Sequence, residues 1–150
     1  GEKPAVCPLV FTGNILFPTD FSENAKTAFD ILVNLVSNYS PVVTLYHVQD
    51  KNIVFPHLSH RLEEFNRIDS ERLDTLKAVL LKVGTKDVRI KIETGHTKQL
   101  IVNEINNGDY SLVVMGTQGR GWIEEVLIGG VAHTVIRKSN TSLLLVPFRR

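Results

Sequence analysis

Apolar runs alternate with amphipathic stretches along the chain, and this alternation predicts strands separated by helices. Five runs have the length and composition of strands, at residues 14–18, 42–48, 87–94, 111–115 and 142–146. Four amphipathic stretches have helical spacing, at about residues 22–38, 58–83, 97–106 and 130–138. Strands that alternate with helices pair in parallel, because each helix returns the chain across a sheet face. The pattern therefore predicts an α/β fold, a doubly wound five-stranded parallel sheet in a three-layer α/β/α sandwich with right-handed crossovers.

Local signals mark the ends of these elements. Asp20 or Ser22 can cap the first helix, and Glu23 suits the positive end of its dipole. Gly84 follows the long second helix, where a glycine commonly ends a helix. The strand at 87–94 alternates apolar with charged residues, which predicts a solvent-facing side or a place near the sheet edge.

The first residues do not fit the alternating pattern. Residues 1–13 contain the apolar run Leu9-Val10-Phe11 but precede the first strand–helix unit. We interpret them as an N-terminal extension or a linker, with an extra edge strand as the alternative. The domain itself is expected to span residues 14–150.

Composition and charge narrow the class of protein. The chain has 150 residues, 43% hydrophobic and 22% charged, which is typical of one folded globular domain. Its single cysteine, Cys7, forms neither an internal disulfide nor a metal site alone, so a reducing, cytoplasmic setting is expected. A net charge of +1 without a basic stripe argues against nucleic acid as a partner. No apolar run approaches the ~20 residues of a membrane helix, so no membrane partner is expected.

A glycine-rich segment follows the fourth strand. Gly116 and Gly119 are separated from Gly129 and Gly130 by one insertion, with Arg120 inside it. Glycines let backbone N–H groups converge on a phosphate, and the next helix adds positive potential at its start. Two tight surface turns would explain the same residues. Neither a Walker loop nor the Rossmann glycine pattern fits.

Histidines offer little sign of a metal or hydrolytic site. His57, His60 and Glu63 fall three residues apart, a spacing that drifts around a helix and leaves no evident fourth ligand. His47 and His96 are expected near the ligand rim, but neither has a serine or cysteine in the strand–turn–helix context of a nucleophile. No metal ligand and no catalytic residue is therefore assigned.

Short segments in a fixed order resemble the universal stress protein family. These are 15–23 (ILFPTDFSE), 45–48 (LYHV), 95–96 (GH), 113–116 (VVMG), 135–140 (VIRKSN) and 145–147 (LVP), and the resemblance extends from about residue 14 to 147. It implies the adenine nucleotide alpha hydrolase-like variant of the Rossmann-like sheet. It also implies a stress-response protein.

The nucleotide-binding branch of that family carries Gly, two residues, Gly, nine residues, Gly, then Ser or Thr. Gly116, Gly119 and Gly129 match these intervals, whereas Gly130 lacks the hydroxyl. One lost hydrogen bond removes ~1 kcal/mol, or up to ~3 kcal/mol against a charged oxygen. Micromolar binding corresponds to about 8 kcal/mol, so ATP binding is expected to be weakened without being abolished.

The resemblance also implies a set of site residues. Asp20 would approach the ribose or a phosphate-bound metal, Val48 would meet adenine through its backbone, and Met115 would line the base pocket. The cofactor would be ATP, with Mg or Mn. A helix-capping role for Asp20, and plain core roles for Val48 and Met115, are the alternatives. The expected nucleotide contacts are Pro18, Thr19, Asp20, Val48, Met115, Gly116, Gly119, Arg120, Gly129, Gly130 and Val131.

The function expected is regulatory binding of an adenine nucleotide without conversion of a substrate. Two alternatives stay open: a family member that acts through protein contacts without nucleotide, and a slow ATPase or adenylate-forming enzyme. A homodimer is expected through the last strand, 142–146, because an open apolar edge invites pairing with a second copy. Alternatively, Leu9-Val10-Phe11 covers that edge.

Overall fold

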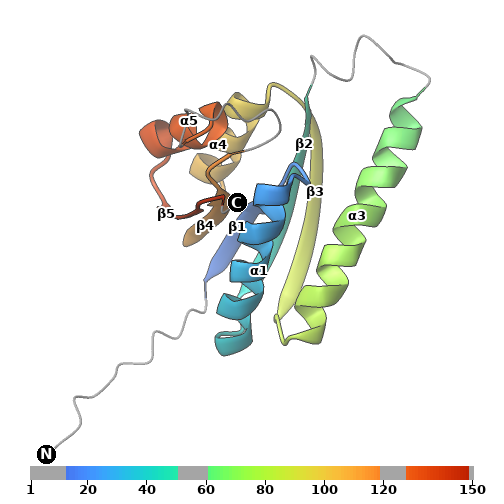
Figure 1. Ribbon diagram of the computed structural model, residues 1–150, viewed down its shortest axis with the longest axis vertical. Helices are drawn as coiled ribbons and strands as arrows, with labels where there is room; N and C mark the ends of the chain where they lie inside the picture. Colours follow the sequence, from blue (N-terminus) through green and yellow to red (C-terminus); the bar gives the residue numbers. More distant parts are fainter. Residues whose placement is uncertain (1–12, 51–60, 119–127, 149–150) are drawn as a thin grey trace, which may run out of the picture.

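The computed structural model describes residues 13–50, 61–118 and 128–148 (Figure 1). These residues form one five-stranded sheet in which every neighbouring pair is parallel, in the order β3-β2-β1-β4-β5. The predicted fold class is confirmed. The strands are β1 (Asn14–Pro18), β2 (Val42–Asp50), β3 (Asp87–Gly95), β4 (Leu112–Gly116) and β5 (Ser142–Val146).

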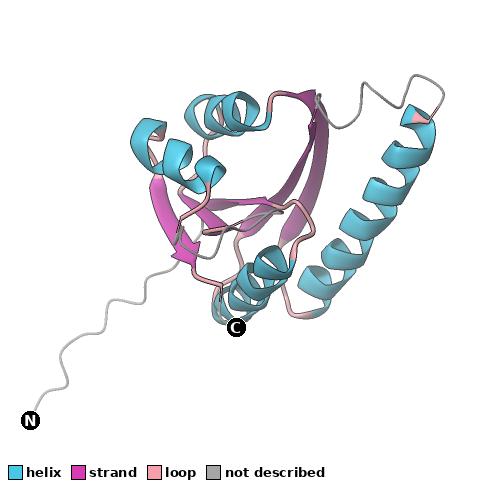
Figure 2. Ribbon diagram, turned by 45° about the horizontal axis from the view of Figure 1, so that its top comes forward, coloured by secondary structure: helices cyan, strands magenta, loops and turns pink. Residues whose placement is uncertain are grey.

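Helices cover both faces of the sheet and complete the three predicted layers (Figure 2). α1 (Glu23–Asn38) and α3 (Leu62–Lys82) lie on one face, and α4 (Thr97–Asn107) and α5 (Gly130–Lys138) lie on the other. α3 begins at Leu62, and residues 58–60 of the predicted long helix lie outside the described residues. Within the described ranges, no helix has the length and apolar character needed to cross a membrane.

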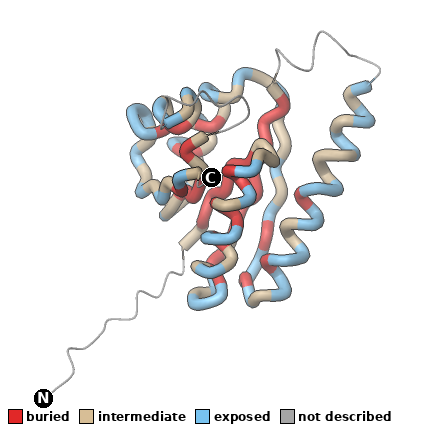
Figure 3. Tube along the Cα trace, viewed as in Figure 1, coloured by how far each residue is buried: buried red, intermediate tan, exposed pale blue. Residues whose placement is uncertain are grey.

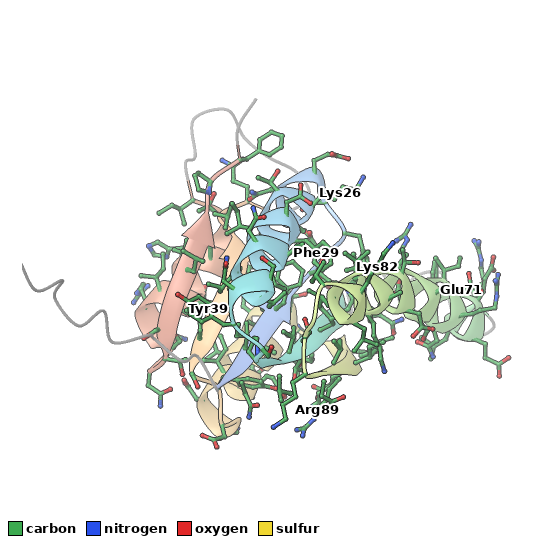
Figure 4. The ribbon with its side chains drawn as sticks, turned by 90° about the horizontal axis from the view of Figure 1, so that it is seen from below. Lys26, Phe29, Tyr39, Glu71, Lys82 and Arg89 are labelled. Atoms are coloured by element: carbon green, nitrogen blue, oxygen red, sulfur yellow. The ribbon has the colours of Figure 1, made fainter. Side chains whose placement is uncertain are left out.

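Buried residues concentrate along the central strands (Figure 3), and the alternation of side chains along these strands produces two hydrophobic layers. Ile15 and Phe17 of β1 pack beneath α1 and α3, whereas Leu16 between them packs beneath α4 and α5. Phe29, labelled on α1 in Figure 4, meets Phe17 edge to face with ring centroids 5.7 Å apart. β1 therefore lies in the centre of the molecule, buried from both sides.

The residues before α1 form a tight, hydrogen-bonded turn. The Ala25 N–H donates to Ser22 Oγ over 3.2 Å, so Ser22 is the N-cap. The Ser22 N–H in turn donates to Asp20 Oδ1 over 3.0 Å. Of the two predicted capping residues, Ser22 caps the helix and Asp20 organises the turn that leads into it. Gly84 has a φ of +103°, the left-handed conformation that allows glycine to follow the end of α3.

β3 forms one edge of the sheet, as its alternation of apolar and charged residues predicts. A polar network connects β3 to α4. Lys91 Nζ donates to Glu104 Oε2 of α4 over 2.6 Å and lies 3.0 Å from Glu93 Oε1. The Tyr46 hydroxyl donates to Glu93 over 3.1 Å, and the Tyr110 hydroxyl donates to Glu104 over 2.7 Å. The carboxylates of Glu93 and Glu104 thus accept hydrogen bonds from one lysine and two tyrosines. Each tyrosine hydroxyl can no longer donate its bond once it is deprotonated.

This network predicts a loss of stability at alkaline pH. Burial and the bond to Glu104 raise the pKa of Tyr110 to about 12, and burial with the bond to Glu93 raises the pKa of Tyr46. A pKa raised in the folded state stabilises the protein below the unfolded value of 10.0, and this stabilisation is lost as the pH rises above it. We expect the urea midpoint to fall from about pH 10 upward. Tyr110→Phe should flatten that fall by about 1 kcal/mol, whereas Tyr39→Phe at the end of α1 should leave it unchanged.

Candidate functional site

Several of the predicted site residues lie at the carboxyl ends of β1 and β4, where the order in which strands are added to the sheet changes side. From β1 the chain adds β2 and β3 on one side, then crosses to add β4 and β5 on the other. The carboxyl ends of β1 and β4 therefore border the switch point at which open α/β sheets bind ligands. Pro18, Thr19 and Asp20 follow from β1, and Met115 and Gly116 end β4.

The connection from β4 to α5 is closed at its base. The Thr117 N–H donates to the Val146 carbonyl over 3.0 Å, and the Gly129 N–H donates to the Thr117 carbonyl over 2.5 Å. The two glycine groups that flank the predicted insertion are thus joined directly at Thr117 and Gly129. Gly119 and Arg120, which belong to the predicted phosphate contacts, lie outside the described residues.

The start of α5 has the character of an anion site. Gly129 is its N-cap and provides no side-chain hydrogen bond to the first turn, which contains no acidic residue. The first N–H groups of a helix lack partners within the helix and carry its positive dipole. Gly130 and Val131 therefore present backbone donors at the sheet edge where the resemblance implies phosphate contacts.

An asparagine that the sequence did not single out holds the β4 connection in place. Asn24, in the first turn of α1, is only 3% exposed. Its Nδ2 donates to the Val146 carbonyl over 3.1 Å, and its Oδ1 accepts from the Gln118 N–H over 2.6 Å. A Cβ on Gly116 would lie 2.5 Å from Asn24 Oδ1. The close approach of Asn24 therefore explains the glycine at position 116 without a ligand.

Val48 and Met115 belong to the core beneath α4 and α5. They are 8% and 6% exposed and pack in the same cluster as Leu16 and Tyr46. The alternative reading of both as core residues is thus correct for their side chains. The structure leaves the Val48 backbone as the part of this residue to which the resemblance assigns a role.

Hydrogen bonds to β2 and within the turn hold the segment between β1 and α1 that carries Asp20. The Thr19 N–H donates to the Tyr46 carbonyl over 2.9 Å, which extends the pairing of β1 with β2. The Phe21 N–H donates to Thr19 Oγ1 over 3.1 Å, and Phe21 takes a φ of +61°, rare for a residue other than glycine. Strain of this kind persists only where neighbouring contacts impose it.

His47 and a carboxylate of α3 supply those contacts. His47 Nδ1 lies 2.7 Å from the Thr19 carbonyl, and its Nε2 lies 3.2 Å from Asp69 Oδ2. Its ring packs against Phe21 with centroids 4.6 Å apart, and Gln49 Nε2 donates to the same Asp69 oxygen over 3.1 Å. His47 was expected near the ligand rim; it is buried and supports the turn that carries Asp20.

Among the described residues, no group of three or more His, Cys, Asp or Glu side chains has the arrangement of a metal site. Glu63 lies on α3, whereas His57 and His60 of the same predicted spacing lie outside the described residues. Of the carboxylates near the switch point, Asp20 is the one that the resemblance places beside a phosphate-bound metal.

Comparison with known proteins agrees with this geometry. The universal stress protein family matches residues 12–147. The universal stress protein MJ0577 of Methanocaldococcus jannaschii is 30% identical over an alignment of 151 positions. The alignment covers 88% of this chain and 93% of that protein. The solved structure of MJ0577 gives a TM-score of 0.78 at 29% identity and covers 95% of this chain and 99% of its own.

Two further solved structures share the fold at lower identity. UspA from Lactobacillus plantarum has a TM-score of 0.79 at 20% identity, covering 90% of this chain and 97% of its own. A universal stress protein in complex with cAMP has a TM-score of 0.66 at 19% identity, covering 89% and 94%. The sequence, the sheet order and these matches agree: the chain belongs to the universal stress protein family.

Proposed function

We propose that this protein binds an adenine nucleotide, ATP, at the carboxyl edge of its sheet and acts as a regulatory protein of the stress response. The observation that carries the proposal is the closed connection between β4 and α5. Its base, joined by the Gly129–Thr117 hydrogen bond, lies beside the switch point and directly before the uncapped start of α5. Backbone donors there suit phosphates better than they suit an uncharged ligand.

The proposed contacts divide among three walls. Pro18, Thr19 and Asp20 form the wall beyond β1, where the Asp20 carboxylate approaches the ribose or a Mg or Mn ion on the phosphates. The Val48 backbone meets adenine, with Met115 in the layer beneath. The phosphates are surrounded by the glycine-rich connection and the start of α5, that is, by Gly116, Gly119, Arg120, Gly129, Gly130 and Val131. The family member solved with cAMP supports the choice of an adenine nucleotide, because that ligand shares the adenosine group.

The test is calorimetric titration with ATP and magnesium, preceded by mass analysis of gently denatured protein for nucleotide that co-purified with it. We expect one ATP per chain, a Kd on the order of micromolar and no rapid turnover. No binding at millimolar ATP would contradict the proposal and favour a family member that acts through protein contacts. Gly130, which lacks the hydroxyl of the nucleotide-binding motif, is the feature that favours that alternative. Rapid hydrolysis would point instead to an ATPase.

We also propose that two copies pair through β5. β5 forms the edge of the sheet opposite β3, and Leu144 on it is 36% exposed. Ile136 of α5, the helix that leads into β5, is 42% exposed. An edge strand with apolar side chains and unpaired backbone groups invites a second strand. Residues 9–11, the alternative cover for this edge, lie outside the described residues.

Light scattering at micromolar concentration tests the pairing, and we expect the mass of two chains. Leu144→Lys should shift the mass to one chain, because the lysine places a charge on the proposed interface. Leu81→Lys is the matched control, since Leu81 is 46% exposed on α3, which packs against β3 at the opposite edge of the sheet. A mass of one chain for the unaltered protein would reject the dimer. Removal of residues 1–12 would then show whether they cover the edge.

A further inference from the structure

Lys98, which no part of the family motif includes, reaches the start of α5. It is the second residue of α4, and α4 and α5 pack beside each other on one face of the sheet (Figure 1). A Cβ on Gly130 would lie 3.1 Å from Lys98 Nζ and 3.3 Å from its Cε. The ammonium group therefore lies over the first residue of α5, in space that a side chain at position 130 would occupy.

The ammonium group lies at the positive ends of two helix dipoles, and the Asp50 carboxylate at the start of α4 accepts from the Thr97 hydroxyl over 3.4 Å rather than from Lys98. Lys98 lies in the first turn of α4 and against the first turn of α5, and neither turn contains an acidic residue. Among the described residues, no carboxylate forms an ion pair with Lys98. A cation at the positive end of a helix dipole is unfavourable. An anion between Lys98 and α5 would offset both the charge and the dipole.

A buried hydroxyl at the same place independently indicates a polar ligand. Thr117 is 8% exposed, and its Oγ1 has no hydrogen-bond partner among the described residues. Val113 and Met115 of β4 point toward the α4 and α5 layer, and the Thr117 N–H continues the pairing with β5. By strand alternation the Thr117 side chain points to the same layer, beside Gly129. Buried hydroxyls rarely lack a partner, so this one is expected to have a ligand or a water.

We propose that Lys98 is a phosphate ligand of the bound nucleotide. Its Nζ donates a charge-assisted hydrogen bond to a phosphate oxygen at the start of α5, and the buried Thr117 hydroxyl lies on the same side. This inference rests on the proposed function and deepens it. The site therefore takes phosphorylated adenine nucleotides. Gly130 has no hydroxyl to contact the phosphates, and Lys98 supplies a contact to them from α4. Lys98 offsets the loss of that hydroxyl.

The experiment compares ATP with adenosine, both titrated by calorimetry or NMR into the unaltered protein and into Lys98→Met. A charge-assisted bond is among the stronger hydrogen bonds, so we expect ATP to bind about tenfold more weakly to the variant. Adenosine lacks phosphates and should bind within twofold of the unaltered protein. Lys98→Arg should keep ATP affinity within threefold, because it keeps the charge. Lys82→Met, at the far end of α3 (labelled in Figure 4), changes the net charge equally and should have no effect.

Two results would overturn the inference and leave the proposed function standing. One is a loss of less than fivefold for ATP in Lys98→Met. The other is an equal loss for ATP and adenosine, which would indicate a structural role for Lys98. Failure of the unaltered protein to bind either ligand would overturn the proposed function itself. The titration of the unaltered protein therefore separates the two failures.

Discussion

Replacing Gly116 with alanine is expected to lower the free energy of unfolding by about 2–4 kcal/mol. The new Cβ would lie 2.5 Å from Asn24 Oδ1, inside van der Waals contact. Asn24 cannot move away without loss, because its amide accepts from the Gln118 N–H and donates to the Val146 carbonyl in a buried position. Relief of the overlap would leave buried polar groups without partners, which costs about 1–3 kcal/mol each.

Gly95→Ala is the matched control for this effect. A Cβ on Gly95 would also approach a neighbour closely, 2.8 Å from Leu100 Cδ1, but that atom is the end of a flexible side chain. We expect a cost of about 1 kcal/mol or less there. Urea unfolding at neutral pH measures both variants. If the two substitutions destabilise the protein equally, the account of Asn24 as the reason for glycine at position 116 is wrong.

Asp69→Ala is expected to cost about 2–4 kcal/mol, because it removes one side of a buried polar cluster. The Asp69 side chain is 13% exposed and lies between His47 Nε2, at 3.2 Å, and Arg72 Nη1, at 3.8 Å. Its removal also leaves Gln49 Nε2 with one acceptor fewer. Loss of support for His47 should loosen the Thr19 carbonyl that the other ring nitrogen contacts.

Amide hydrogen exchange distinguishes this effect from a general loss of stability. The Phe21 amide, which donates to Thr19 Oγ1, should exchange faster in Asp69→Ala by more than the global destabilisation accounts for. Asp74→Ala, at an exposed position of the same helix, should change stability by no more than about 0.5 kcal/mol. Equal effects of the two substitutions would contradict the assignment of Asp69 to the support of the turn.

The fold was largely predictable because its signals are local. Alternation of apolar and polar residues located all five strands, and the charged residues of β3 indicated its edge position. Helix ends were predictable from single residues: Gly84 was expected after α3, and the start of α1 was narrowed to Asp20 or Ser22, of which the structure selects Ser22. Glycine spacing indicated one insertion after β4 flanked by two glycine groups, and the structure adds that a bond between Gly129 and Thr117 joins the two flanks.

The supporting residues of the site were not predictable, because their partners are distant in the sequence. Asn24 contacts Gln118 and Val146, which follow it by 94 and 122 residues. His47 and Asp69 lie on a strand and a helix, and no periodicity links them. In the sequence, Lys98 is an ordinary polar residue of a helix. Its position beside Gly130 depends on the packing of α5 against α4, which the sequence pattern does not show. For Gly116 the sequence suggested a phosphate contact, whereas the structure adds a packing reason for the same residue.

The most direct test of nucleotide binding at this edge is titration of the labelled protein with ATP and magnesium, followed through its backbone amide NMR signals. We expect shifts in the amide signals of Thr19, Gly116, Gly130 and Val131, at the ends of β1 and β4 and the start of α5. Amides of α3 and of the β3 edge should stay in place. Absence of shifts at millimolar ATP, or shifts confined to α3 or β3, would contradict nucleotide binding at this edge of the sheet.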